Sequence, residues 1–345
     1  MQVSREQFME QGYLVLREVI PPERLEQVRA DFETLVGRQR KLWARERGPD
    51  DPPGGVWETN PQPRLVSYDK LIDDTTASTV EVWLQESTLG VSRQLLSVPE
   101  AASVAGMMLM CSPVRDHGPA AWHRDIHPID MAPLAGLQKD LRENGPKYVQ
   151  WNIPLYDDDV LWVVPGSHLR LNTEDENRSL SADPRRTVPG GIPVELNAGD
   201  AVVYINYMLH WGSNYSPKTR RTIHGGHSIF PYYPDISFAE YLSPGARTSF
   251  RQWNGKSAAL QDLTEIALRE ARSSHSISIN WGPQFAERFT VEEAAALHRR
   301  FAILDDKLQA EDEHFAPGFQ ARPMRYFFNE MPADFTLEDF IGSWN

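Results

Sequence analysis

Apolar positions in the first hundred residues recur at helical spacing. Residues 5–36, REQFMEQGYLVLREVIPPERLEQVRADFETLV, predict a helix, a short strand, a turn at the Pro-Pro pair and a second helix. Four apolar residues share one face of that second helix: Leu25, Val28, Phe32 and Leu35. Residues 45–63 are rich in Pro, Gly and Asp, which predicts a loop, and residues 73–96 again favour helix.

From about residue 103 to residue 235 the pattern changes to short apolar runs separated by turn signals, which are typical of strands. The runs are SVAGMMLMCS, YVQWNIPLY, VLWVVPGS, IPVELNAGD, AVVYINYM and TIHGGHSIF. Strands of this length and spacing indicate a mainly β fold, with a double-stranded β-helix core of the jelly-roll, cupin-like kind. Helical patterns return at 255–274 and 290–313. We therefore expect a β core between N-terminal and C-terminal helices.

The change of pattern near residue 236 divides the chain into two expected units. Residues 1–235 form the jelly-roll domain with its N-terminal helices, and residues 236–345 form a C-terminal helical extension. Helices in that position serve as a lid, as the interface of a homodimer, or as the cover of one sheet face.

Composition narrows the classes of partner. The net charge of −13 over 345 residues argues against nucleic acid, because phosphate contacts need clustered Lys and Arg. No apolar run approaches the roughly 18 residues that span a bilayer, and the N-terminus lacks a signal-peptide pattern. A single cysteine excludes an intramolecular disulfide framework and a Cys-rich zinc site. We expect a cytoplasmic protein that acts on a small molecule.

The segment WHRDIHP contains His123 and Asp125, separated by one residue. On a strand, residues two apart project to the same side, so this pair can offer two metal ligands from one short segment. His210, which ends an apolar strand, is the candidate third ligand. Two His and one carboxylate form the facial ligand set of non-haem Fe(II) oxygenases, which leaves coordination positions open for cosubstrate and O2.

Two arginines follow His210 by about ten residues, Arg220 and Arg221. The planar guanidinium binds a carboxylate through two parallel hydrogen bonds. Binding of 2-oxoglutarate requires a cation at its far carboxylate. An arginine at the start of the next strand after the distal His is in the position to supply it.

Four segments in this order resemble the phytanoyl-CoA dioxygenase family of Fe(II)/2-oxoglutarate oxygenases. They are FMEQGYLVLREVIPPERLEQVR, WHRDIHP, YVQWNIPLYDDDVLWVVPGSHLR and LNAGDAVVYINYMLHWGSNYSPKTRRTI, and the resemblance covers about residues 5–235. It implies that His123, Asp125 and His210 bind Fe(II).

The same resemblance implies the cosubstrate residues. Arg220 binds the C5 carboxylate of 2-oxoglutarate, with Arg221 as its rival, and Ser213 assists. Trp151 corresponds to an aromatic residue that lines the family's active site. Because Asp125 is present, where halogenating relatives have a small residue, hydroxylation or a related oxidation is favoured over halogenation.

Two departures from the family pattern lie beside the expected ligands. Arg124 stands where the family has Gln, and Trp211 stands where it has Gly after the distal His. Arg124, Arg115 and His127 flank the expected iron, and either face an anionic group of the substrate or are solvated loop charges.

Three functions agree with these features. The first is a 2-oxoglutarate-dependent dioxygenase that hydroxylates or otherwise oxidises an unactivated C–H bond of a small molecule and releases succinate and CO2. The second is a cupin-type metalloenzyme that does not use 2-oxoglutarate, for which the arginine is dispensable. The third is a non-catalytic ligand-binding relative.

Overall fold

The computed structural model describes residues 1–66, 68–97, 99, 102–125, 138, 141, 142, 145–212, 219–229, 237–248, 250 and 251. The helices expected at 255–274 and 290–313 lie outside these residues, as does nearly all of the expected C-terminal unit. Within the described residues, no helix is long and apolar enough to cross a membrane.

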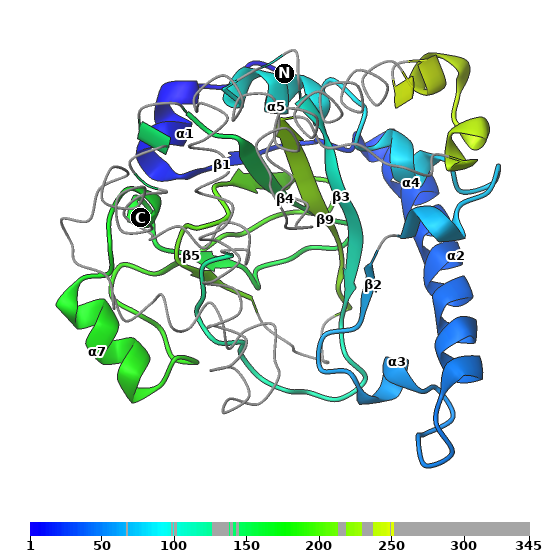
Figure 1. Cartoon of the computed structure of the whole chain (residues 1–345), viewed down its shortest axis with the longest axis horizontal. Helices are drawn as coiled ribbons and strands as arrows, with labels where there is room; N and C mark the ends of the chain where they lie inside the picture. The colour runs from blue at the N-terminus through cyan, green and yellow to red at the C-terminus, as the bar shows by residue number, and fades with distance from the viewer. Residues whose placement is uncertain are drawn as a thin grey trace, which may run out of the picture.

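Two antiparallel sheets form the core, as the short apolar runs predict. The larger sheet has six strands in the order β1 (Tyr13–Leu16), β7 (Ala201–Tyr204), β4 (Tyr148–Pro154), β9 (Arg221–Ile229), β3 (Ala102–Cys111) and β2 (Arg64–Val66). The smaller sheet has the order β6 (Ile192–Pro193), β5 (Trp162–Val163) and β8 (His210–Trp211). The arrangement is the predicted jelly roll, shown in Figure 1.

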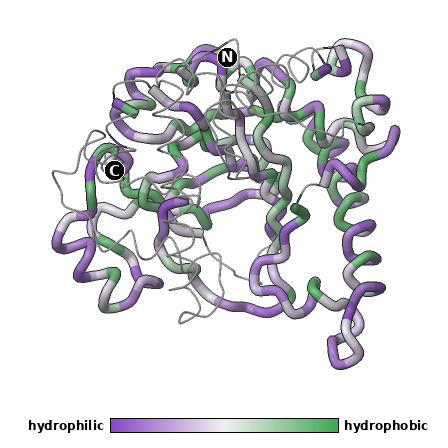
Figure 2. The backbone as a smooth tube through the Cα atoms, viewed as in Figure 1, coloured by the Kyte–Doolittle hydropathy of each residue, from purple (hydrophilic) through white to green (hydrophobic). Residues whose placement is uncertain are grey.

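Helices cover one face of the larger sheet. They are α1 (Arg5–Gln11), α2 (Pro22–Glu46), α4 (Ser78–Glu81) and α5 (Leu89–Leu95). The main apolar core lies between these helices and the sheet, and purple and green alternate along α2 in Figure 2, as expected for a helix with one buried face. The single helical stretch expected at 73–96 is therefore two short helices, and the loop expected at 45–63 contains α3 (Val56–Thr59).

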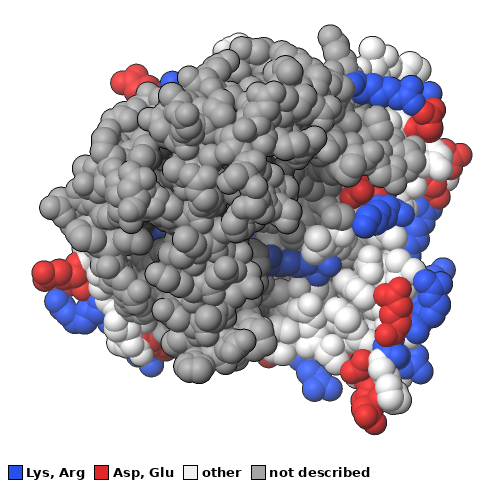
Figure 3. Space-filling view, in the orientation of Figure 1, with Lys and Arg blue, Asp and Glu red and all other residues white. Residues whose placement is uncertain are grey.

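The charges on the surface of this part of the molecule are mixed. Lys and Arg stand among Asp and Glu over α2, at the right-hand edge of Figure 3. This face of the described chain therefore offers no field of a single sign.

The two faces of β4 differ: one packs against the helices, and the other carries polar side chains. Val149, Trp151 and Ile153 belong to the helix-covered core. Because successive side chains alternate, Gln150 and Asn152 face the other way, toward the smaller sheet. The space between the two sheets is therefore lined by polar side chains at this strand.

A tight turn before β7 joins the N-terminal strand to the core. Gly199 has φ +87°, and a Cβ there would come within 2.6 Å of the Ile20 carbonyl oxygen, so glycine is required. Asp200 follows, nearly fully buried, and accepts backbone N–H groups from Glu18 at 3.0 Å and Asn197 at 2.9 Å as well as the guanidinium of Arg17.

We expect Asp200→Asn to lower the free energy of unfolding by about 1–3 kcal/mol at pH 7, because buried N–H donors lose a charged acceptor. Burial alone raises the pKa of Asp200, but the hydrogen bonds from Arg17, Glu18 and Asn197 outweigh it and hold that pKa below its ordinary value. The carboxylate therefore stabilises the fold above about pH 4, and its contribution is lost as the pH falls through the folded-state pKa. Urea denaturation of both proteins at pH 7 and in acid checks this: a difference in stability that persists unchanged in acid would contradict it.

Candidate active site

The three candidate metal ligands are held by backbone hydrogen bonds between two segments. His123 and His210 form an isolated antiparallel bridge, with N···O distances of 2.8 and 2.9 Å. Two residues on, the Asp125 N–H donates to the Asn206 carbonyl oxygen at 2.9 Å, and the Asn206 side chain donates back to the Asp125 carbonyl oxygen at 2.7 Å. The segment that carries two of the ligands is thus tied to the one that carries the third.

The side chains of His123, Asp125 and His210 meet between the sheets. One ligand atom from each lies within 4.8 Å of the others. His123 Nε2 is 3.5 Å from Asp125 Oδ1, and His210 Nε2 is 3.4 Å from Asp125 Oδ2. No other group of His, Cys, Asp and Glu in the described part of the chain meets this test.

The hydrogen bonds of the two imidazoles assign their tautomers. Nδ1 of His123 lies 2.9 Å from the Ala121 carbonyl oxygen, and Nδ1 of His210 lies 2.7 Å from the Met208 carbonyl oxygen. Each Nδ1 must carry a proton to donate to a carbonyl, so each ring in its neutral form directs an Nε2 lone pair toward the Asp125 carboxylate. Three electron-rich groups that converge in this way fit a bound cation.

The electrostatics of the cluster agree with that fit. Burial, helped by the nearby His210, lowers the pKa of His123 to about 4, so the ring is a neutral ligand at pH 7. Burial raises the pKa of Asp125, but His210, His123 and the amide of Gln150 outweigh it, and the carboxyl is ionised. Gln150 Nε2 donates to Asp125 Oδ2 at 2.6 Å and to the Tyr204 hydroxyl at 2.8 Å.

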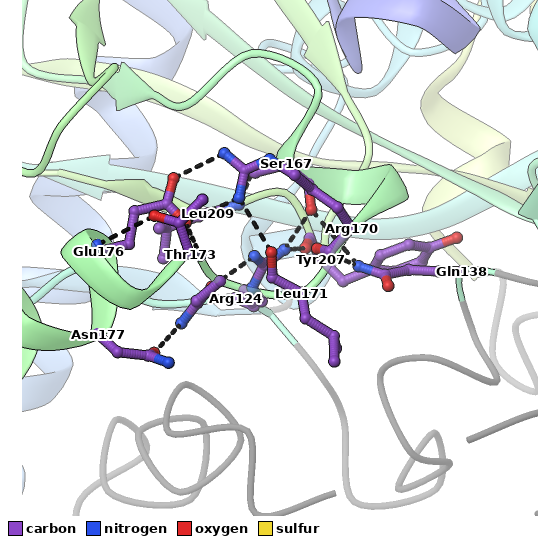
Figure 4. A network of polar contacts seen from close by, with 11 residues as sticks. Arg124, Gln138, Ser167, Arg170, Leu171, Thr173, Glu176, Asn177, Tyr207 and Leu209 are labelled. Carbon is purple, nitrogen blue, oxygen red and sulfur yellow. Dashed lines mark hydrogen bonds and ion pairs between the residues drawn. The ribbon is translucent and has the colours of Figure 1, made fainter. Parts of the chain in front are cut away.

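Arg124 does not face this centre and is fully buried, so both expectations for it, that it faces a substrate or is a solvated loop charge, are wrong. Lying between His123 and Asp125, it projects to the opposite side. Its guanidinium is fully buried and donates to the carbonyl oxygens of Ser167 at 2.8 Å and Tyr207 at 2.7 Å, both labelled in Figure 4. It also donates to Asn172 Oδ1 at 2.7 Å. It joins three segments of the chain. Of the other two flanking residues, Arg115 is exposed, and His127 lies outside the described residues.

Trp211, the second departure from the family pattern, lies in a separate apolar cluster of the smaller sheet. Its ring stacks on that of Trp122, with centroids 5.1 Å apart. Trp122 thus precedes the candidate ligand His123, Trp211 follows the candidate ligand His210, and the two tryptophans pack together.

Arg220 and Arg221 lie on opposite faces of the larger sheet. Arg221 binds Glu33 of α2 at 2.7 Å and lies over the ring of Trp57, on the helix-covered side. Arg220 donates from Nε to Asp158 Oδ2 at 2.9 Å, and Thr222 donates to the same oxygen. Because only Nε of Arg220 is engaged by the described residues, its two terminal nitrogens are left to bind an anion.

Two of the expected cosubstrate residues are not brought to this site. Trp151 is fully buried on the helix-covered face, where Nε1 donates to Ser92 Oγ of α5 at 3.0 Å, so the expectation that it lines the active site is wrong. The alternation of β4 turns Trp151 away from the centre and turns its neighbour Gln150 toward it. Ser213 lies outside the described residues.

Further residues near the centre were not expected from the sequence. His224 of β9 lies with Nδ1 2.6 Å from Asn152 Oδ1. Burial first, and then the charge of Arg64, lowers its pKa to about 3. His224 is thus a neutral polar group beside the cluster and not a member of it. Polar residues that alternate with apolar ones, as Gln150 and Asn152 do in YVQWNIP, are the sequence signal that could have found this lining.

Residues 8–222 match the family model described as phytanoyl-CoA dioxygenase (PhyH). The chain belongs to the phytanoyl-CoA dioxygenase family. It is thereby an oxygenase of the kind that uses Fe(II) and 2-oxoglutarate, and its His-Asp-His cluster fits the iron. No curated protein matches the chain.

Among solved structures, this phytanoyl-CoA dioxygenase family member is similar to several proteins at low identity. AviO1 from Streptomyces viridochromogenes Tue57 is 22% identical, with 67% of this chain and 95% of that chain covered and a TM-score of 0.45. HygX from Streptomyces hygroscopicus, with nickel and 2-oxoglutarate bound, is 17% identical, with 67% and 89% covered and a TM-score of 0.45. EctD from S. alaskensis is 15% identical, with 66% and 78% covered and a TM-score of 0.46. Likenesses this distant do not indicate a substrate.

Proposed function

We propose that the protein is an Fe(II)/2-oxoglutarate-dependent dioxygenase that hydroxylates, or otherwise oxidises, an unactivated C–H bond of a small molecule. The observation that carries the proposal is the convergence of His123 Nε2, His210 Nε2 and the Asp125 carboxylate within 4.8 Å. This is the ligand set of non-haem Fe(II) oxygenases, with coordination positions left open. When bound there, Fe(II) with 2-oxoglutarate supplies the activation of O2 that such an oxidation needs.

The protein's own residues prepare the ligands. The carbonyl oxygens of Ala121 and Met208 fix each imidazole in the tautomer that presents Nε2. Gln150 directs the Asp125 carboxylate through its 2.6 Å hydrogen bond. Partners of this kind orient metal ligands and tune their basicity.

Arg220 is the proposed partner of the C5 carboxylate of 2-oxoglutarate. Asp158 fixes it through Nε, which directs the two terminal nitrogens to a bidentate carboxylate. Arg221 lies on the helix-covered face, bound to Glu33, which supports Arg220 over Arg221 for this role. Ser213 keeps its proposed assisting role, because the resemblance that suggests it is unaffected by the structure.

We expect a visible charge-transfer band when Fe(II) and then 2-oxoglutarate are added to the protein without oxygen. The band arises only when the keto acid chelates the iron, so it separates this function from that of a cupin-type metalloenzyme or a ligand-binding relative. Anaerobic absorption spectroscopy on metal-replete protein measures it, with protein plus Fe(II) alone as the control. Absence of the band, with iron shown to be bound, would contradict the proposal.

A further inference from the structure

A row of four side chains crosses the inner face of the larger sheet, the face that is turned to the smaller sheet. Residues directly opposite one another in neighbouring strands project to the same face. In the antiparallel register the row consists, from β2 through β3 and β9 to β4, of Val66, Met108, His224 and Asn152. Their face is the inner one, because residues next to them in the chain lie in the helix-covered core: Leu65, Leu109, Ile223 and Trp151.

The row changes from open and apolar to buried and polar. β2 is an edge strand of the sheet, and Val66 is 63% exposed. Met108 is partly buried, and Asn152 is only 3% exposed. Neighbouring strands lie about 4.8 Å apart, so the row is roughly 14 Å long. A molecule that enters from this edge therefore meets apolar side chains first and polar groups at the inner end.

The imidazole of His224 offers a hydrogen-bond acceptor at that inner end. Its Nδ1 lies 2.6 Å from Asn152 Oδ1, which can only accept, so the proton is on Nδ1. Nε2 therefore carries a lone pair, and it makes no hydrogen bond within the described part of the chain. Burial first, and then the charge of Arg64, lowers the pKa of His224 to about 3, which leaves the ring neutral at pH 7. The ring can thus accept a hydrogen bond from a bound molecule.

The polar end of the row adjoins both parts of the proposed active site. Two residues along β9 from His224, Thr222 shares an acceptor oxygen with Arg220, the proposed cosubstrate arginine. Two residues along β4 from Asn152, Gln150 donates to a metal ligand. A spacing of two residues along a strand is about 7 Å. A molecule held at His224 thus lies beside the metal cluster and the cosubstrate, where the substrate of an oxygenase must lie.

The partner of His224 Nε2 must be a neutral hydrogen-bond donor. It is not 2-oxoglutarate, because the ionised keto acid has only acceptor oxygens, and any other anionic group faces the same conflict with the lone pair. A protonated amine is disfavoured by Arg64 and Arg220, whose positive charges help to lower the pKa of His224. A hydroxyl group meets the requirement, because it donates a hydrogen bond without carrying a charge.

We propose that the substrate is a neutral molecule with an apolar body and a hydroxyl group, and that this hydroxyl donates a hydrogen bond to Nε2 of His224. The apolar body lies along Met108 and Val66, toward the open edge of the sheet. The inference rests on the proposed function, because it needs the metal and 2-oxoglutarate beside this row. It adds the class of substrate, which the metal cluster by itself does not indicate.

The test uses a panel of linear, monocyclic and polycyclic aliphatic alcohols, from hexanol to a sterol. Each alcohol is compared with the methyl ether, the primary amine and the carboxylic acid on the same carbon frame. Binding is read anaerobically from the change that each compound causes in the charge-transfer band of the protein with Fe(II) and 2-oxoglutarate. We expect alcohols of the panel to bind, and their methyl ethers to bind about tenfold more weakly, because the ether oxygen cannot donate. The amines and acids should bind more weakly than the alcohols as well.

Three variants assign these effects to the row. His224→Phe removes the acceptor and should weaken binding of the alcohol by about tenfold, while binding of the methyl ether changes by less than about twofold. His224→Gln keeps an acceptor oxygen and should recover part of the loss. Val66→Asp places a charge in the apolar part of the row and should weaken the alcohol and the ether alike. His117→Phe is the matched control, because His117 is an exposed histidine.

The band with 2-oxoglutarate alone separates the failure of this inference from that of the proposed function. If the wild type gives no such band, the proposed function fails. If the band is present and no alcohol alters it, or the amines or acids bind more tightly than the alcohols, the inference is overturned. Equal weakening of alcohol and methyl ether in His224→Phe would overturn it as well, since the residue would then only shape the pocket. Thermal denaturation of the metal-free proteins checks that each variant is folded.

Discussion

Asp125→Ala is expected to abolish the visible band of the Fe(II)–2-oxoglutarate complex and to eliminate 2-oxoglutarate-dependent succinate formation. The substitution removes the only carboxylate of the described metal cluster and leaves two imidazoles. The negative charge that balances a divalent cation in this buried site disappears with it. The separate variant His210→Ala should also abolish the band, because it removes one of the two histidine nitrogens of the cluster.

The measurement pairs anaerobic spectroscopy with direct metal analysis after desalting. Asp74→Ala provides a matched control, since Asp74 is an exposed carboxylate remote in sequence from the cluster. Circular dichroism should show that the metal-free Asp125→Ala protein is folded. The substitution removes one of three electron-rich groups that repel one another when no metal is bound. A variant that keeps the band at wild-type intensity would remove Asp125 from the proposed ligand set.

Arg124→Met is expected to lower the free energy of unfolding by about 3 kcal/mol or more, because each hydrogen bond to a charged group contributes about 1.5–3 kcal/mol. The change leaves three acceptors, on Ser167, Tyr207 and Asn172, without their donor inside the protein. Burial lowers the pKa of the guanidinium to about 9, which leaves the wild-type side chain charged at pH 7. Urea denaturation of the metal-free protein gives the size of the loss.

The same variant should also bind metal more weakly, because Tyr207 lies three residues before His210. Arg124→Gln, which introduces the family's usual residue, can still donate to one or two of the acceptors and should fall between the wild type and Arg124→Met. Arg24→Met, an exposed site on α2, controls for loss of an arginine. Stability equal to the wild type in Arg124→Met would show that the network of Figure 4 does not depend on this cation.

The metal cluster could be predicted from the sequence because its signal is local. A spacing of two places His123 and Asp125 on the same side of an extended segment whatever the rest of the fold does. The same alternation also predicts that Arg124 projects away from them, so its position away from the metal cluster could have been predicted from the sequence. His210 needed the additional resemblance to a family whose segments occur in the same order.

The face of β4 could have been predicted from the same alternation, but Trp151 was assigned to the wrong side. Almost every residue of this strand is buried, with both sides packed. Burial therefore does not distinguish the two sides, and only the alternation of apolar with polar residues does. The polar side chains of Gln150 and Asn152 carry the information, because polar groups gather where the chemistry is.

The direction of the Arg64 side chain on β2, which shares a sheet face with Met110 and Thr222, could not be predicted for a different reason. β2 is three residues long and follows the Pro-Gln-Pro of residues 61–63 in a stretch that reads as a loop. Its strand character comes from pairing with β3, a contact between segments about 45 residues apart in the chain. Local sequence does not contain that pairing, and so does not show which way the arginine projects.

The stacked pair of Trp122 and Trp211 has an optical consequence. Two indoles with centroids 5.1 Å apart are expected to couple their electronic transitions and to contribute an exciton couplet to the ultraviolet circular dichroism spectrum. The ring of Trp162, 6.0 Å from that of Trp211, is expected to contribute to the same signal. Each indole is the chain neighbour of a ligand histidine, so the sign and size of that couplet depend on how the two ligand segments are oriented. A shift of either segment should therefore change the circular dichroism signal of these tryptophans, which can be measured without any added chromophore.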